Sequence, residues 1–243
     1  MRITIILPTY NEAENLPKLV SALLSLPLDL SLLVVDDHSP DGTGKVADEL
    51  CAHHPSQVSV LHRPGKDGLR SAYMEGFQKA LDDGADVVVQ MDADFSHDPA
   101  VLTEMAHRIA SCDVVIGSRY VEGGSLDERW PAWRKLLSAF GNFYAWTILR
   151  FPLRDVTTGY RMWRREVLQK MPLDRIRSNG YIFLVEMIYV AYLMGHKISE
   201  VPIYFADRRW GESKMSFKIQ LEAAVRIWDV WWHYRDMRGA FSK

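Results

Sequence analysis

The 243-residue chain is poor in cysteine, with only Cys51 and Cys112, and their spacing excludes a cysteine-based metal motif. No apolar run approaches the roughly 18 residues that a membrane-spanning helix requires. The first residues lead directly into a strand pattern, without the basic and apolar segments of a targeting peptide. We therefore expect a protein of the reducing cytoplasm, peripheral at the cytoplasmic face of a membrane through its own surface or through a membrane-anchoring partner subunit.

An excess of charge of either sign is also lacking. The formal net charge is −2, and the 25% of charged residues are mixed in sign along the chain. A protein that binds nucleic acid through a broad basic surface is thus not expected. Hydrophobic residues make up 48% of the chain, which is enough for a substantial core in a folded globular protein.

Short apolar runs rich in β-branched residues alternate with amphipathic helical patterns. This order predicts an α/β fold with a mainly parallel sheet flanked by helices. Pro99 suits the start of one helix, with Asp98 as its cap. The expected strands cover residues 3–8, 30–35, 58–61, 87–91 and 114–117, and expected helices include 14–26, 69–81 and 99–111.

Polar or acidic clusters follow three of these strands. Because ligands of open α/β sheets bind outside the carboxyl ends of the strands, we expect the clusters to meet in one crevice. This predicts that residues 1–120 bind a nucleotide. The clusters cover residues 8–12, 36–39 and 92–94.

Asp92 and Asp94 are the most informative pair, because they lie two residues apart at the end of an apolar strand. Carboxylates so placed hold Mg²⁺ or Mn²⁺ against a diphosphate, which indicates a nucleotide-sugar site. An isolated pair of this kind is equally compatible with a strand end that caps the next helix. The neighbouring clusters favour the metal site.

The pattern changes after residue 120. Residues 130–149 predict a helix rich in aromatics, followed by a polar loop at 155–161, a helix near 181–194, a strand near 197–204, a basic loop at 207–214 and a terminal helix. There is no internal repeat or linker. We therefore expect a single domain, 1–243, in which 121–243 form an acceptor-binding extension with a C-terminal amphipathic helix.

The chain resembles the family 2 glycosyltransferases, and within them the dolichol-phosphate mannosyltransferase group. The departures are small: His38 replaces a usual glycine, and Val156 and Tyr160 vary inside one motif. The resemblance implies a Rossmann-like GT-A type fold of the kind without transmembrane helices. The segments that carry it are residues 7–12, 35–43, 91–97, 117–120, 155–161 and 211–214.

This resemblance implies inverting, metal-dependent transfer of mannose from GDP-mannose to a polyprenyl (dolichyl-type) phosphate. Asp94 is expected to bind the metal directly, Asp92 the ribose or a metal-bound water, and Ser96 is a further oxygen ligand. Arg208 and Lys214 are expected to close over the phosphates. The remaining donor-site residues are Pro8, Tyr10, Glu12, Val35, Asp37, Ala93 and Arg119.

A phosphate acceptor is already largely anionic near neutral pH, so it needs positive charge and in-line placement more than a base. Arg119 and Arg134 are the candidates for that charge. Ser138 and Asn142 share a helical face with Arg134 and are candidate neutral donors. Asp155 is expected to orient an arginine or to approach the sugar.

Three alternatives remain open on the sequence. The donor is a uridine diphosphosugar, the acceptor is a hydroxyl group with Asp155 as its general base, or the chain is a non-catalytic nucleotide-sugar-binding subunit. The terminal helix is amphipathic and rich in tryptophan and arginine, which is typical of a membrane interface. Packing of these tryptophans on the core or on a partner subunit is the competing interpretation.

Overall fold

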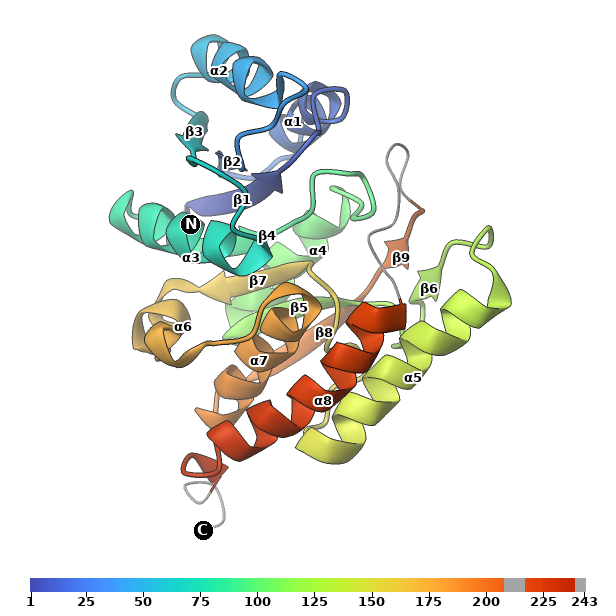
Figure 1. Cartoon of the computed structure of the whole chain (residues 1–243). Helices are drawn as coiled ribbons and strands as arrows, with labels where there is room; N and C mark the ends of the chain where they lie inside the picture. Colours follow the sequence, from blue (N-terminus) through green and yellow to red (C-terminus); the bar gives the residue numbers. More distant parts are fainter. Residues whose placement is uncertain (208–216, 239–243) are drawn as a thin grey trace.

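The computed structural model describes residues 1–207 and 217–238, and their core is a seven-stranded sheet in the order β3-β2-β1-β4-β7-β5-β8 (Figure 1). All neighbours in it are parallel except β7, which runs antiparallel to both β4 and β5. The strands are β1 (Ile3–Thr9), β2 (Leu30–Asp36), β3 (Val58–His62), β4 (Val87–Gln90), β5 (Val114–Ser118), β7 (Arg161–Arg164) and β8 (Ile198–Pro202). The expected α/β architecture is confirmed.

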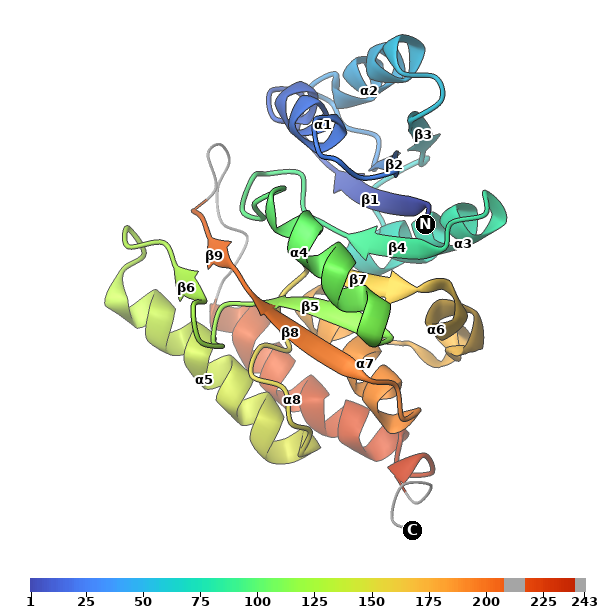
Figure 2. The same cartoon turned by 180° about the vertical axis from the view of Figure 1, so that it is seen from behind.

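Helices cover both faces of the sheet, because alternate strand residues are apolar on each side. Residues such as Ile5 and Val89 pack with helices α1 (Leu16–Leu24), α2 (Thr43–His53) and α4 (Val101–Arg108). Residues such as Ile6 and Val88 face the other layer. That layer contains α3 (Leu69–Asp82), α5 (Ala132–Leu149), α6 (Arg165–Lys170), α7 (Gly180–Leu193) and α8 (Phe217–His233), as Figures 1 and 2 show.

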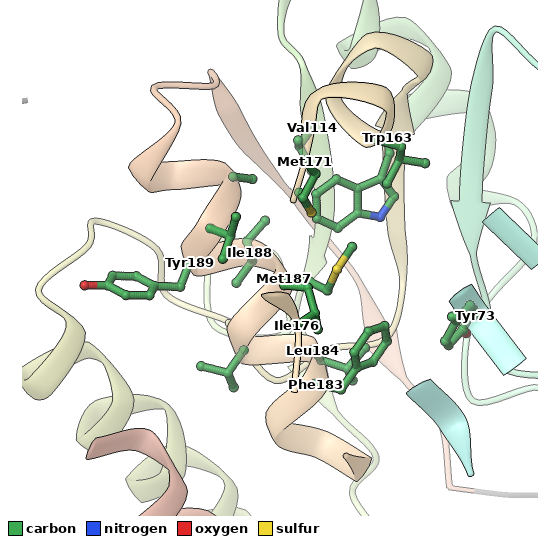
Figure 3. Packing of buried hydrophobic residues seen from close by; sticks show 14 of the residues in the cluster. Tyr73, Val114, Trp163, Met171, Ile176, Phe183, Leu184, Met187, Ile188 and Tyr189 are labelled. Carbon is green, nitrogen blue, oxygen red and sulfur yellow. The ribbon is translucent and has the colours of Figure 1, made fainter. Parts of the chain in front are cut away.

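The larger core cluster fills the layer between the sheet and helices α3, α5, α6, α7 and α8. Trp163 on β7 is fully buried beside Met171 and Met187 (Figure 3). Its indole Nε1 donates to Gln90 Oε1 at 2.8 Å. Nearly all side chains of α7 are buried, so this helix fixes the second half of the chain against the sheet.

Several element bounds differ from the sequence prediction. The first helix begins at Leu16 instead of residue 14, because Glu12 O accepts from Asn15 N and Leu16 N in a preceding turn. Pro99 precedes α4 instead of starting it, and Asp98 accepts from Ala100 N at 2.9 Å in that turn. The predicted helix end at 111 is a 3₁₀ turn, Ile109–Ser111.

The predicted strand near 197–204 divides into β8 and a short β9 (Tyr204–Phe205). β9 pairs with β6 (Ser125–Leu126), so the chain beyond β8 runs alongside the loop that follows β5. Within the described parts of the chain, no helix has the length and apolarity to cross a membrane.

Candidate functional site

The first two polar clusters lie side by side at the carboxyl edge of the sheet. Thr9 and Asp36 are register partners at the ends of β1 and β2, and Thr9 Oγ1 donates to Asp36 Oδ1 at 3.2 Å. Asp36 also accepts from Ser39 Oγ at 2.5 Å. Asp36 thus braces the loop that carries the predicted donor residue Asp37.

The predicted base-binding residues share this corner. Pro8 and Val35 are register partners, and Tyr10 is half-buried just beyond them. The Nζ of Lys66 lies 3.5 Å from the centroid of the Tyr10 ring, a cation–π contact. Glu12 accepts from Asn15 Nδ2 at 2.8 Å, so its carboxylate is partly engaged at the start of α1.

Asp37 has a partner that the sequence prediction missed. Arg63, 2% exposed just after β3, donates from Nη1 to Asp37 Oδ1 and from Nε to Glu75 Oε1 at 3.0 Å. Burial raises the pKa of Asp37 above 3.8, although the hydrogen bond and charge of Arg63 oppose that rise. The arginine therefore orients a buried carboxylate in the predicted donor pocket. A basic residue directly after a strand was the available signal.

Asp92 and Asp94 extend from the end of β4 into the same edge. Asp94 is 4% exposed, and its Oδ1 accepts from Ser96 N at 3.0 Å. Phe95, between Asp94 and Ser96, has a φ of 61°, a left-handed backbone conformation that residues other than glycine rarely adopt. This turn directs Asp94 and Ser96 toward one another.

The residues present fit a divalent cation bound together with a diphosphate. Among residues 1–207 and 217–238, no group of three His, Cys, Asp or Glu side chains is placed to hold a metal by itself. Mg²⁺ at phosphate sites commonly uses one or two carboxylates, with phosphate and water as its other ligands. The Ser96 hydroxyl is buried with no hydrogen-bond partner in the described structure, which leaves it available as an oxygen ligand.

His97 closes the turn. Asp92 N donates to His97 Nδ1 at 3.1 Å, and the imidazole stacks on Tyr160 with ring centroids 4.8 Å apart. Burial lowers the pKa of His97 below 6.5, outweighing the nearby Asp92 and Asp94 carboxylates. The ring is thus neutral at physiological pH.

Arg119 and Asp155 form a buried, two-pronged ion pair beside this turn. The Nε and Nη2 of Arg119 donate to the two carboxylate oxygens of Asp155 at 2.7 Å each, and Arg119 N donates at 3.0 Å. Burial on its own raises the pKa of Asp155, but the charge and hydrogen bonds of Arg119 outweigh it and hold the pKa below 3.8. Asp155 therefore holds the Arg119 guanidinium in a fixed orientation.

Arg134 lies at the start of α5 with partners of its own. It stacks over Trp130, 3.6 Å from the ring centroid, and its Nη1 donates to Asp207 Oδ1 at 3.2 Å. Trp130 Nε1 donates to the same Asp207 oxygen at 3.1 Å. The predicted phosphate ligands Arg208 and Lys214 lie outside the described residues.

The two other predicted hydrogen-bond donors on α5, Ser138 and Asn142, contact residues next to the Arg119–Asp155 pair. Asn142 Oδ1 accepts from Val156 N at 2.8 Å, and its Nδ2 donates to Thr157 Oγ1 at 3.2 Å. Ser138 Oγ accepts from the hydroxyl of Tyr120 at 2.7 Å. Asn142 therefore holds the 155–161 loop, whose Thr157 also accepts from Arg119 Nη2 at 2.7 Å.

Arg161, like Arg63, is a buried arginine to which the sequence analysis gave no role. Fully buried at the start of β7, it donates to the carbonyl oxygens of Thr158, Leu184 and Val156. Burial lowers its pKa to about 9, so it stays charged at neutral pH. It ties the 155–161 loop to α7.

Solved structures share this architecture. The mannosyltransferase of Pyrobaculum calidifontis, in complex with GDP-Man and Mn²⁺, is 17% identical with a TM-score of 0.58, covering 98% of this chain and 73% of that one. Glucosyl-3-phosphoglycerate synthase of Mycobacterium tuberculosis, in complex with Mn²⁺, UDP and phosphoglyceric acid, is 15% identical with a TM-score of 0.64, covering 94% and 76%. These likenesses confirm the predicted GT-A type fold.

Relatives found by sequence have much higher identity to this chain than these solved structures do. Undecaprenyl-phosphate mannosyltransferase of Micrococcus luteus is 47% identical, covering 93% of both chains. Polyprenol monophosphomannose synthase of Mycolicibacterium smegmatis is 45% identical, covering 93% of this chain and 85% of the relative. Dolichol-phosphate mannosyltransferase of Pyrococcus furiosus is 38% identical, covering 94% and 63%. The profile of glycosyl transferase family 2 matches residues 4–171, and the chain belongs to this family.

Proposed function

We propose that this family 2 glycosyltransferase transfers mannose from GDP-mannose to a polyprenyl phosphate, with inversion at the anomeric carbon. The relatives at 38–47% identity carry names for mannosyl transfer to lipid phosphates. The observation that carries the proposal is the Arg119–Asp155 pair, which bears on the chemistry of the acceptor.

A hydroxyl acceptor needs a general base, and Asp155 was the candidate for that role. Both of its carboxylate oxygens accept hydrogen bonds from Arg119, and its pKa is held below 3.8, so it is a weak and inaccessible base. A phosphate oxygen needs no such base, because it is already anionic near neutral pH. The geometry therefore favours the phosphate acceptor.

Arg119 and Arg134 supply the positive charge that a phosphate acceptor requires. Asp155 fixes the guanidinium of Arg119, and Trp130 supports that of Arg134, so neither side chain must be ordered when the acceptor binds. The Arg134 contact with Asp207 is exchangeable for a phosphate oxygen, since it is partly exposed. Attack by that oxygen on the face opposite the leaving diphosphate inverts the anomeric centre.

The donor occupies the corner formed by Pro8, Tyr10, Val35 and Asp37, with its diphosphate directed to Asp94 and Ser96. Ala93, between the two aspartates, is buried. A divalent cation held by Asp94, with Asp92 and Ser96, would neutralise charge on the leaving diphosphate. Mn²⁺ in the two solved neighbours supports a divalent cation, and GDP-Man in one of them supports the donor. Arg208 and Lys214 complete the phosphate site in this proposal.

A lipid acceptor also requires that the enzyme reach a membrane. Helices α5 and α8 lie side by side in both views of the fold (Figures 1 and 2). Both helices expose large apolar side chains. Trp228 anchors the pair, since its Nε1 donates to Tyr144 Oη at 2.9 Å while over half of the residue remains exposed. We assign this aromatic face to membrane contact. It comprises Trp133, Leu136, Phe140, Phe143, Trp146, Val225, Trp228 and Trp232.

The test is transfer of labelled mannose from GDP-mannose into an organic-extractable product, with purified protein, a polyprenyl phosphate in detergent, and Mg²⁺ or Mn²⁺. The proposal predicts a mild-acid-labile lipid product that EDTA and Asp94→Asn abolish. Asp98→Asn, on an exposed turn four residues away, is the matched control. Transfer from UDP-glucose instead, or only to a hydroxyl acceptor, would overturn the proposal.

A further inference from the structure

His97 is a fully enclosed histidine whose two ring nitrogens have different surroundings. Only 1% of the residue is exposed. Its Nδ1 accepts from Asp92 N at 3.1 Å, so a neutral ring carries its proton on Nε2. That Nε2–H has no hydrogen-bond partner in the described structure. A buried, unused donor is costly, and one beside a ligand site calls for an explanation.

The unused donor faces a carboxylate. His97 Nε2 lies 4.0 Å from Asp92 Oδ2, about one ångström beyond hydrogen-bonding distance. The imidazole is held on two other sides, stacked on Tyr160 and edge-on to Phe205 with centroids 5.6 Å apart. These contacts hold the ring in its present orientation, and a shift of the Asp92 carboxylate by about one ångström would bring Oδ2 within hydrogen-bonding distance of Nε2.

Gly159 of the 155–161 loop lies next to both residues. A Cβ added at Gly159 would lie 3.5 Å from both Asp92 Oδ1 and His97 Cε1. The absence of a side chain at Gly159 thus brings the loop against both residues without filling the space between them. The 155–161 loop therefore contacts His97 and Asp92 through Gly159 and Arg119 through Asp155.

We propose that His97 is a positioning residue of the donor site: its Nδ1 fixes the backbone turn at Asp92, and its Nε2–H holds the Asp92 carboxylate in place when nucleotide and metal bind. This proposal rests on the proposed function for the identity of the nucleotide. It adds a second layer behind the carboxylates, of the kind that orients ligands at other metal sites.

Two variants separate the nitrogens. His97→Gln places an amide near the Nε2 position and retains a donor to Asp92, whereas His97→Asn retains an acceptor near Nδ1 and loses that donor. We expect Asn to weaken Mn²⁺-dependent GDP binding and to raise the donor KM by about tenfold or more, with kcat less affected. Gln, which keeps the donor to Asp92 but loses the acceptor for Asp92 N, should bind GDP more tightly than Asn does. His97→Phe, which keeps the stacking on Tyr160 but loses both nitrogens, should be at least as impaired as Asn.

His196 provides the matched control. Its Nε2 is also buried without a partner and its Nδ1 lies 3.6 Å from Asp113, but it precedes β8 at the opposite edge of the sheet. His196→Asn should therefore leave GDP binding unchanged. The readouts are calorimetric titration of GDP with Mn²⁺, Mn²⁺ binding by electron paramagnetic resonance, and the melting temperature of each variant.

The outcomes are distinct. Weak binding in Asn and Phe with recovery in Gln, at unchanged melting temperature, supports the inference. Wild-type GDP binding in all three His97 variants would overturn it. So would a loss of binding that parallels the drop in melting temperature, whether or not the variant retains a hydrogen-bond donor to Asp92. If wild-type protein binds no guanine nucleotide with Mn²⁺, the proposed donor fails instead, and the same titration with UDP tests His97 independently.

Discussion

Asp155 shows why the partner of an acidic residue must be known before it is assigned a catalytic role. Asp155→Asn leaves Arg119 as a buried charge with one weakened partner. We expect a loss of about 3 kcal/mol of unfolding free energy, together with lower activity and a raised acceptor KM. Chemical denaturation and steady-state kinetics of the same sample measure both.

The pH dependence separates positioning from base catalysis. Because the folded pKa of Asp155 lies below 3.8, its stabilising contribution is complete above that value and is lost only as the pH falls through the folded pKa. The kcat/KM profile of the wild type between pH 5 and 9 should therefore contain no limb from Asp155. An acidic limb that disappears in Asp155→Asn would contradict this assignment.

Arg63 offers a second prediction at the level of single residues. Arg63→Met removes the charge that opposes the raised pKa of Asp37, so the pKa should rise further. The carboxylate is then unfavourable while ionised, and we expect destabilisation of about 3 kcal/mol near pH 7 that shrinks toward pH 4.5 as Asp37 becomes protonated. Arg63→Lys keeps a charge and should lose less. Equal losses at both pH values would rule out this coupling.

At the level of elements, the sequence predicted the parallel strands well because they are short apolar runs, three of which end in a polar cluster. It did not predict β7. Its residues, Arg161–Arg164, begin and end with arginine, which is atypical of a central strand. The strand is stable because Arg161 donates to backbone carbonyls and Trp163 to Gln90, contacts that exist only in the folded chain. Helix α2 was not among the helices named from the sequence. Its buried face is small, because only Thr43 and Ala47 are buried.

The link between α5 and the 155–161 loop is testable through Asn142. Asn142→Leu leaves Val156 N without its acceptor, and we expect a loss of about 1–3 kcal/mol and a higher acceptor KM at unchanged donor KM. Asn142→Asp retains the acceptor for Val156 N and loses the Nδ2 donor to Thr157 Oγ1 and to the Ser138 carbonyl oxygen. It should be closer to wild type in urea unfolding. A rise in donor KM in both variants would show that α5 supports a different part of the site.

At the scale of the whole molecule, the sequence predicted that polar clusters from distant segments meet at one edge, because parallel strands present their carboxyl ends together. The structure adds residues that lie between those clusters in the sequence and contact them in the fold. Arg63 and Lys66 reach Asp37 and Tyr10 from the segment after β3. No motif marks such residues, since their role depends on which strands are neighbours in the sheet.

The aromatic face of α5 and α8 leads to a prediction about the whole enzyme. Trp228 and Trp232 are 53% and 60% exposed, and each should bury apolar area on binding to vesicles. We expect the double change to serine to weaken sedimentation with anionic vesicles about tenfold or more, and to lower transfer to a membrane-embedded polyprenyl phosphate but not to a short, water-soluble prenyl phosphate. Tyr204→Ser, at an exposed position on β9, is the control for loss of a surface aromatic. Unchanged vesicle binding in the double variant would assign the face to a protein partner, because its tryptophans do not pack on the core of this chain.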